Sequence, residues 1–255
     1  MDPLRRILRH EDETTNLDEA ALLIARIEYP DLALAPCLAE LDFHAEEIRR
    51  RSGRSFRLGA HQYLFDEVGF EGNDEDYYNA HNSCLNYLLE SRRGIPITMC
   101  ILYMELGRRL GVNVDGIGAP GHFLVRLEEE DDTYYLDVFN RGRIREDVEE
   151  EVEAHYLVAA SKRMILVRML NNLRLIYLQR QAWGKASEVL NLLLEADPVD
   201  ADALRQRAAT LAATNRFQAA AQDLNRFLQL RPSDPDKDEL KDQIARLHRM
   251  HAHKN

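Results

Sequence analysis

The stretch RGIPITMCILYMELGRRLG, residues 93–111, decides how the middle of this chain folds. Gly94-Ile95-Pro96 is a turn signal, and Pro96 suits the first position of a helix, where its missing N–H would be unpaired anyway. The stretch predicts a helix from Pro96 to about Leu110 that stops at Gly111. Its apolar side chains point in most directions, and a helix that is apolar all round is usually buried at the centre of a domain.

Three strand-like segments follow this central helix. We expect strands at residues 113–119, 122–127 and 133–139, with an acidic turn at residues 128–132 between the second and the third. Alternation of side-chain types along the second segment is typical of a strand that is buried on one face. A hairpin packed on a central helix predicts an α+β core rather than an α/β one.

The residues before the central helix carry apolar side chains at helical spacing. They predict a helix at residues 17–29, with Asn16 as its N-cap, and a second helix at residues 34–51. Residues 56–90 are predicted to be further helix, broken by a loop near residues 69–74. We therefore assign residues 1–160 to one domain, in which a helical N-terminal region precedes the α+β core.

The last third of the chain contains an internal repeat with a period of 34 residues. Asp197-Pro198 recurs as Arg231-Pro232, and Trp183 aligns with Phe217 at the same shift. Other apolar positions agree at this shift, namely Ala186 with Ala220, Leu190 with Leu224, Leu193 with Phe227, and Leu194 with Leu228. This period is typical of the tetratricopeptide repeat, a helix–turn–helix unit that buries one face against its neighbour.

The repeat predicts an all-α module at residues 165–250. We expect one repeat at residues 165–198, a second at residues 199–232, and a capping helix at about residues 235–250. Stacks of this kind present a concave groove that holds a peptide or a helix of another protein. The expected partner is therefore another protein or peptide, bound through this module.

Composition limits the other partners and the location of the protein. The chain has 33 Lys and Arg against 44 Asp and Glu, a formal net charge of -11, which argues against nucleic acid and against an anionic membrane surface. Three cysteines without a CxxC pair fit a reducing compartment. Neither a signal peptide nor a stretch of about 20 apolar residues is evident. We expect a cytoplasmic protein.

Four short segments carry a resemblance to a known family. They are Asn82-Ser83, Arg93-Gly94-Ile95-Pro96-Ile97, Pro120-Gly121-His122-Phe123-Leu124-Val125 and Asp137-Val138-Phe139-Asn140. With these segments the chain resembles the bacterial SirB-type family, whose members have a transglutaminase-like, papain-like domain followed by tetratricopeptide repeats. The resemblance runs from about residue 12 to residue 250 and implies the same order of domains.

The resemblance implies a site made of three positions. Transglutaminase-like enzymes place a cysteine at the N-terminus of a central helix, with a histidine and an acid on neighbouring strands. The histidine of the family matches His122 and the acid matches Asp137, which we expect to lie within hydrogen-bond reach directly or through one water. The nucleophile position matches Pro96, which has no reactive side chain. The resemblance therefore implies a remnant of a catalytic triad.

Simpler interpretations of the same residues stay open at this point. His122 could be a histidine at a strand edge, and Asp137 could be a turn-forming aspartate before Asn140, Arg141 and Gly142. The run after Asp137 also departs from the family pattern, which has a proline after the aspartate and a second glycine.

Two other thiols are alternative nucleophiles. Cys100 lies one helical turn after Pro96, inside an apolar helix where burial raises a thiol pKa. Cys84 follows Asn82-Ser83 at a helix start, although the family usually has a bulky apolar or aromatic residue there. Cys37 has no chemical context.

Two functions follow from these observations. The favoured hypothesis is a protein-interaction protein in which the transglutaminase-like domain is a pseudoenzyme. The alternative is a thiol-dependent peptide hydrolase or acyltransferase that uses His122 and Asp137 with Cys84 or Cys100. The sequence has no phosphate-binding glycine loop and no dinucleotide fingerprint, and its acidic runs lack the spacing of a calcium loop, so it predicts neither a cofactor nor a metal site.

Overall fold

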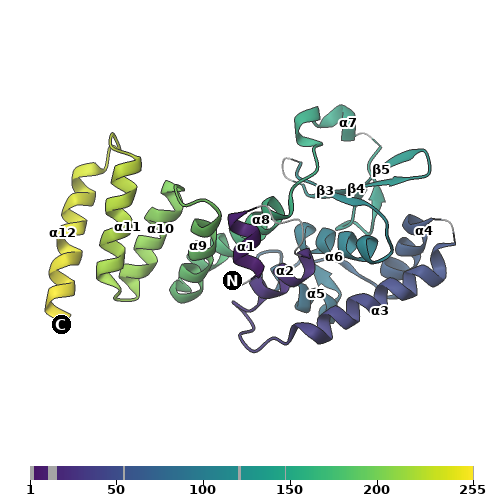
Figure 1. The fold of residues 1–255 in the computed structure, drawn as a ribbon, viewed down its shortest axis with the longest axis horizontal. Helices are drawn as coiled ribbons and strands as arrows, with labels where there is room; N and C mark the ends of the chain where they lie inside the picture. The colour runs from purple at the N-terminus through teal and green to yellow at the C-terminus, as the bar shows by residue number, and fades with distance from the viewer. Residues whose placement is uncertain (1–2, 11–15, 54, 120–121, 147, 255) are drawn as a thin grey trace. The chain divides into compact units, whose positions relative to one another are not determined.

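A computed structural model of the chain describes residues 3–10, 16–53, 55–119, 122–146 and 148–254. Figure 1 follows the chain by colour from its N-terminus to its C-terminus. The chain forms two compact units, Met1–Met169 and Leu170–Asn255. Among the described residues, no helix combines the length and the apolar character needed to cross a membrane.

The first unit begins with a group of helices. They are α1 (Pro3–Arg9), α2 (Leu17–Ala25), α3 (Leu34–Ser52), α4 (Phe56–Ala60), the π-helix η1 (His61–Glu67), the 3₁₀-helix η2 (Ala80–Ser83) and α5 (Leu85–Ser91). Asn16 occupies the N-cap position of α2, but its side chain makes no capping hydrogen bond. Instead, the N–H of Leu17 donates to Glu105 Oε1 at 3.2 Å. A carboxylate from the central helix therefore takes over the role predicted for Asn16.

The central helix, α6, runs from Pro96 to Arg109 and packs against α3 and the sheet. Its buried residues, among them Ile97, Ile101 and Leu106, lie around the helix, as its all-round apolar character predicts. Gly107 permits the close approach of the sheet, since an added Cβ would lie 2.6 Å from Cγ2 of Val114. The helix is therefore the centre of the first unit.

The sheet of the first unit is antiparallel and has the order β3-β4-β5-β6. Its strands are β3 (Val114–Ile117), β4 (Leu124–Glu129), β5 (Asp132–Asp137) and β6 (Arg143–Ile144). In the hairpin, Val125 pairs with Leu136 and Glu129 pairs with Asp132. This arrangement confirms the predicted α+β class, in which the central helix lies against a small antiparallel sheet.

Two pairings were not predicted. The short strand β6 joins β5 because the turn after Asp137 brings Arg143 back opposite it. In addition, β1 (Glu71–Gly72) and β2 (Arg93–Gly94) form a short parallel pair. Strands of two residues carry too few side chains for an alternation pattern to develop.

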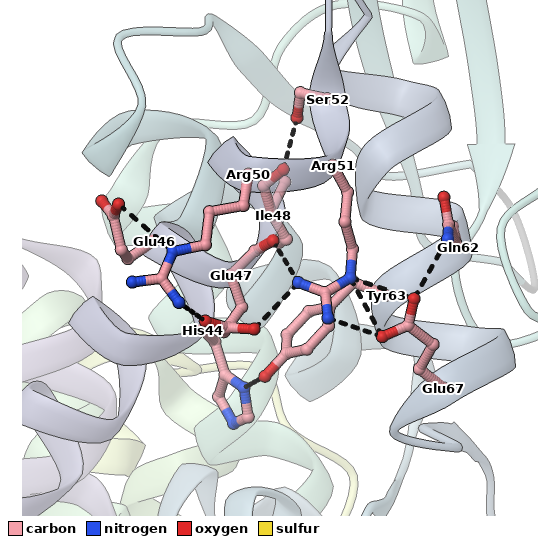
Figure 2. A network of polar contacts seen from close by, with 10 residues as sticks. All are labelled: His44, Glu46, Glu47, Ile48, Arg50, Arg51, Ser52, Gln62, Tyr63 and Glu67. Atoms are coloured by element: carbon pink, nitrogen blue, oxygen red, sulfur yellow. Dashed lines mark hydrogen bonds and ion pairs between the residues drawn. The ribbon is translucent and has the colours of Figure 1, made fainter.

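A polar network joins α3 to the π-helix η1 (Figure 2). Arg51 binds Glu47 on its own helix at 2.9 Å and Glu67 on η1 at 2.7 Å. Deeper in the same region, His44 Nδ1 lies 2.8 Å from the Tyr63 hydroxyl. The deprotonated form of His44 is favoured, since burial, and then the positive charge of Arg92, lower its pKa to about 4.

In the described part of the second unit, all regular secondary structure is helical. The boundary between the units falls inside α8 (Lys162–Gln179), which is followed by α9 (Trp183–Ala196), α10 (Ala201–Ala213), α11 (Phe217–Leu230) and α12 (Lys237–Lys254). Trp183 and Phe217 each begin a helix, α9 and α11 respectively, which agrees with the predicted alignment. Phe217 is buried, whereas Trp183 is only half-buried, as is common for a side chain of that size.

Candidate functional site

A cleft of about 340 Å³ opens at the N-terminus of α6 in the first unit. It is formed where the start of α6, the segment before β4 and the end of β5 meet the loop that follows β1. Its lining residues are Asp74, Tyr77, Pro96, His122, Phe123, Asp137, Phe139 and Asn140. The structure thus brings Pro96, His122 and Asp137, which lie far apart in the sequence, to one cleft.

Pro96 is the first residue of α6, and Ile95 before it has the extended backbone that proline requires of its predecessor. The first N–H groups of a helix are unpaired and carry a partial positive charge, so this end of α6 favours an anion. The described residues that line the cleft include no cysteine. The position that the resemblance gives to the nucleophile is therefore electrostatically suitable for a thiolate but holds a proline.

Asp137 is the last residue of β5, and its side chain is buried. Both carboxylate oxygens accept hydrogen bonds from Asn140: Oδ1 from the backbone N–H at 3.1 Å and Oδ2 from the side-chain amide at 2.7 Å. The carbonyl of Asp137 also accepts from the N–H of Gly142 at 2.9 Å. Asp137 therefore organises the turn after β5 and at the same time presents a carboxylate to the cleft.

His122 lies two residues before β4, and its side chain is exposed. Its backbone is fixed on both sides, because its N–H donates to the carbonyl of Ala119 at 3.1 Å and its carbonyl accepts from Nη2 of Arg168 at 3.2 Å. The Arg168 guanidinium also lies over the Phe123 ring, 5.3 Å from its centroid. Arg168, on α8, is a positioning residue that the sequence analysis did not identify.

No direct hydrogen bond joins the side chains of His122 and Asp137, both of which lie in the described part of the chain. The carboxylate of Asp137 is engaged by Asn140 instead. The role of the two residues as a catalytic remnant, including a bridge through one water, stays a prediction. Pro120 and Gly121, which belong to the same family segment as His122, lie outside the described residues.

Both alternative thiols are fully buried. The Cys100 thiol donates to the carbonyl of Phe123 at 3.4 Å, and burial, followed by the negative charge of Asp137, raises its pKa well above the usual range. Cys84 stands at the N-cap of α5, with its sulfur 3.7 Å from the carbonyl of Ala80. Neither thiol lines the cleft, and burial disfavours the thiolate that nucleophilic attack requires.

A second set of residues, for which the sequence predicts no role, shapes the cleft. Asn73 Nδ2 donates to Asn82 Oδ1 at 3.0 Å, and Asn82 Nδ2 donates to the carbonyl of Asp76 at 2.6 Å. The hydroxyl of Thr98, in the first turn of α6, donates to the carbonyl of Asn82 at 2.8 Å. These bonds fix the loop that carries Asp74 and Tyr77 onto the helix that begins at Pro96.

The same region shows no obvious metal centre. Within the residues that the structure describes, no group of three or more His, Cys, Asp or Glu side chains is arranged to hold a metal ion. The chemistry available in the cleft is that of one imidazole, two carboxylates, an amide and three aromatic rings.

Comparison with known proteins identifies two regions of the chain. Residues 35–171 match the model of the transglutaminase-like superfamily, and residues 173–245 match a tetratricopeptide-repeat model. The order of the two domains confirms what the resemblance implies. No solved structure matches the chain.

Relatives that match over nearly the whole length are bacterial. A UPF0162 protein of Xylella fastidiosa (strain 9a5c) is 36% identical over 257 residues, which covers 93% of this chain and 92% of the relative. A UPF0162 protein of Pseudomonas aeruginosa is 30% identical over 257 residues, and the aligned region covers 94% of each of the two chains. The chain therefore belongs to the transglutaminase-like superfamily and, within it, to the UPF0162 family of bacterial proteins.

A more distant similarity involves part of the chain only. F-box only protein 21 of Homo sapiens is 34% identical over 124 residues, which covers 43% of this chain and 20% of that protein. The match shows that a segment of this kind also occurs within a much longer protein.

Proposed function

We propose that this protein is an interaction protein whose transglutaminase-like domain is a pseudoenzyme and whose repeats bind a peptide segment of another protein. The two kinds of domain support a protein-interaction role. The observation that carries the pseudoenzyme proposal is Pro96, which occupies the first position of α6 in the cleft shared with His122 and Asp137. The three cysteines without a CxxC pair fit the further proposal of a cytoplasmic location.

The burial of the cysteines supports the same proposal. A thiol enzyme needs a nucleophile that is exposed to substrate and readily ionised. Cys84 and Cys100 are buried, and partial burial, followed by the negative charge of Glu40, raises the pKa of Cys37. We expect every thiol of the native chain to react sluggishly.

The test of the pseudoenzyme proposal is selective alkylation at neutral pH. The intact protein is treated with a substoichiometric electrophile, and the modified cysteines are located by peptide mapping. We expect slow reaction without strong preference for Cys84 or Cys100. Rapid and selective labelling of either one would favour the thiol-dependent hydrolase or acyltransferase instead.

The test of the binding proposal uses an exposed residue of the repeats. Leu175 on α8 is 60% exposed, a large apolar side chain that the fold itself does not cover. In affinity capture, the intact chain should retain a partner protein, and the Leu175→Asp variant should retain less of it. Val199→Asp is the matched control, because Val199 is 61% exposed between α9 and α10. Equal capture by the intact chain and by both variants would contradict binding through the surface around Leu175.

A further inference from the structure

Aromatic side chains line the candidate cleft, and Tyr78 adjoins one of them. Tyr77 and Tyr78 are 39% and 68% exposed, and their ring centroids lie 5.3 Å apart. The Tyr77 ring also meets Phe139 edge-on, at 6.2 Å and 72°. Large aromatic side chains contribute much of the binding energy at protein interfaces, and folding alone gains little from leaving them exposed.

The loop that holds these rings is internally fixed. The Asn73–Asn82 bond anchors one part of it, and the side-chain amide of Asn79 donates to Asp76 Oδ2 at 2.8 Å. The side-chain oxygen of Asn79 accepts in turn from the N–H of His81 at 3.1 Å. A surface whose backbone is held in this way loses little conformational entropy when a partner binds.

The charges around the cleft select the occupant. Asp74 and Asp137 line it, whereas no Lys or Arg is among its described lining residues. Arg168 lies close by, bound to the His122 carbonyl and the Phe123 ring, but its single positive charge leaves the two carboxylates in excess. Arg93 is engaged by Glu71 and Glu75, at 2.7 and 3.1 Å. A cation therefore complements the cleft better than a neutral or anionic group.

The kind of cation follows from the walls. A guanidinium is flat, stacks on aromatic faces and donates from a planar fork to carboxylates, whereas an ammonium is a compact and strongly hydrated charge. Asp137 retains acceptor capacity, because each carboxylate oxygen that binds Asn140 has a second lone pair. We infer that the cleft binds the arginine side chain of an extended segment of a partner protein, with Tyr77 and Phe139 as walls and Asp74 and Asp137 as counter-charges. This inference rests on the proposed function, in which the transglutaminase-like domain catalyses no reaction.

The experiment uses the full chain and small ligands of defined chemistry. N-acetyl-arginine amide, its lysine counterpart and the neutral, nearly isosteric citrulline derivative are titrated while nuclear magnetic resonance follows the aromatic signals. We expect saturable binding of the arginine derivative and about tenfold weaker binding of the citrulline one. The lysine derivative should bind at least about threefold more weakly than arginine, because it lacks the planar fork.

Variants separate the cleft from the overall negative charge. Asp74→Asn should weaken arginine binding about fivefold, whereas Asp131→Asn, at the exposed tip of the hairpin, should change it by less than about 1.5-fold. Tyr77→Leu tests the aromatic wall and should also weaken binding about fivefold. Asp74 and Tyr77 are both exposed, so these variants keep the fold.

Three outcomes would overturn the inference. They are equal binding of arginine and citrulline, equal binding of arginine and lysine, or equal weakening by Asp74→Asn and Asp131→Asn. The alkylation and capture experiments above do not depend on this ligand. If they succeed while arginine binding fails, only the arginine inference is lost; selective labelling of Cys84 or Cys100 would instead remove the proposed function itself.

Discussion

The contacts within the two units of this protein differ in how far apart in the sequence the joined residues lie. In the repeat module, α10 contacts α9 and α11, and Arg207 binds Asp223 and Asn191, each 16 residues away. In the transglutaminase-like unit, Glu105 caps a helix that begins 88 residues earlier. The difference explains why a period in the sequence describes the repeats well, while the cleft requires the folded chain.

The repeat module should be sensitive to the loss of one core side chain. Phe217→Ala should destabilise this unit by about 3–5 kcal/mol, the usual cost of removing a buried Phe. Trp183 is the only tryptophan of the chain and lies in the same unit, so its fluorescence during urea unfolding reports on the repeats. Met250→Ala, at a residue that is 48% exposed, is the control and should cost less than about 0.5 kcal/mol. A loss below about 1 kcal/mol for Phe217→Ala would mean that the repeat register is wrong.

The transglutaminase-like unit should lose stability in mildly acidic solution because of His44. The pKa of His44 falls from 6.5 to about 4 on folding. The stability that His44 contributes is therefore complete above pH 6.5 and is lost as the pH falls toward about 4, because the unfolded state then binds the proton. Between pH 7 and pH 4.5 this loss should be about 2–3 kcal/mol.

The groups around His44 define its control. Arg92 opposes protonation, Glu40 lies 3.7 Å from Nε2, and the Tyr63 hydroxyl meets the other ring nitrogen. His44→Gln keeps a polar side chain that does not titrate. The difference in unfolding free energy between the wild type and this variant separates the pH dependence due to His44 from that due to the carboxylates, which both proteins share. A difference that stays constant across this pH range would contradict the prediction.

A buried ion pair in the repeats gives a smaller effect. Asp223 is 6% exposed and accepts from Arg207 Nε and Nη2, both at 2.7 Å. Arg207→Met keeps the apolar stem but leaves the carboxylate without its partner, and it should cost about 2 kcal/mol. Arg205→Met is the matched control, since its pair with Asp236 is about half exposed and should contribute less than about 1 kcal/mol. Similar losses in both variants, measured by urea unfolding, would show that burial does not matter here.

The sequence predicts the repeats and the central helix because their signals are local. The 34-residue shift aligned Trp183 with Phe217, and both begin helices. The alignment does not predict that Trp183 is only half-buried, because burial depends on neighbouring helices as well as on the period. The central helix was found from Pro96 and the apolar run that follows it.

The cleft was predictable only in part. The resemblance brought out Pro96, His122 and Asp137, and the structure gathers them, but the role of Asn140 as partner of Asp137 is visible only in the turn geometry. Asn82 belongs to one of the family segments, but the resemblance gives it no role. Its bonds to Asn73 and Thr98 join segments whose pairing no local pattern encodes.

The variant Pro96→Cys should change stability least, and it tests most directly whether the cleft of the first unit is a remnant catalytic site. Pro96→Cys places a thiol at the first position of α6, where the unpaired N–H groups of the helix favour an anion. An imidazolium at His122 would add a positive charge nearby. Losing the proline should cost less than about 1 kcal/mol, because the first helical position does not depend on it. The cysteines at positions 37, 84 and 100 are replaced, so that only the introduced thiol reports.

The readout is the rate of iodoacetamide alkylation against pH. Thiols in such settings have pKa values of about 3.5–7.5, against about 8.5 for an ordinary cysteine. We expect an acidic pKa at position 96 that rises when His122→Ala is added. A thiol pKa near about 8.5 that does not respond to His122→Ala would show that the cleft holds no remnant of a triad. Pro96 would then act only as the first residue of a helix. The cleft, like the repeats, would have to be explained by binding and not by descent from a catalytic site.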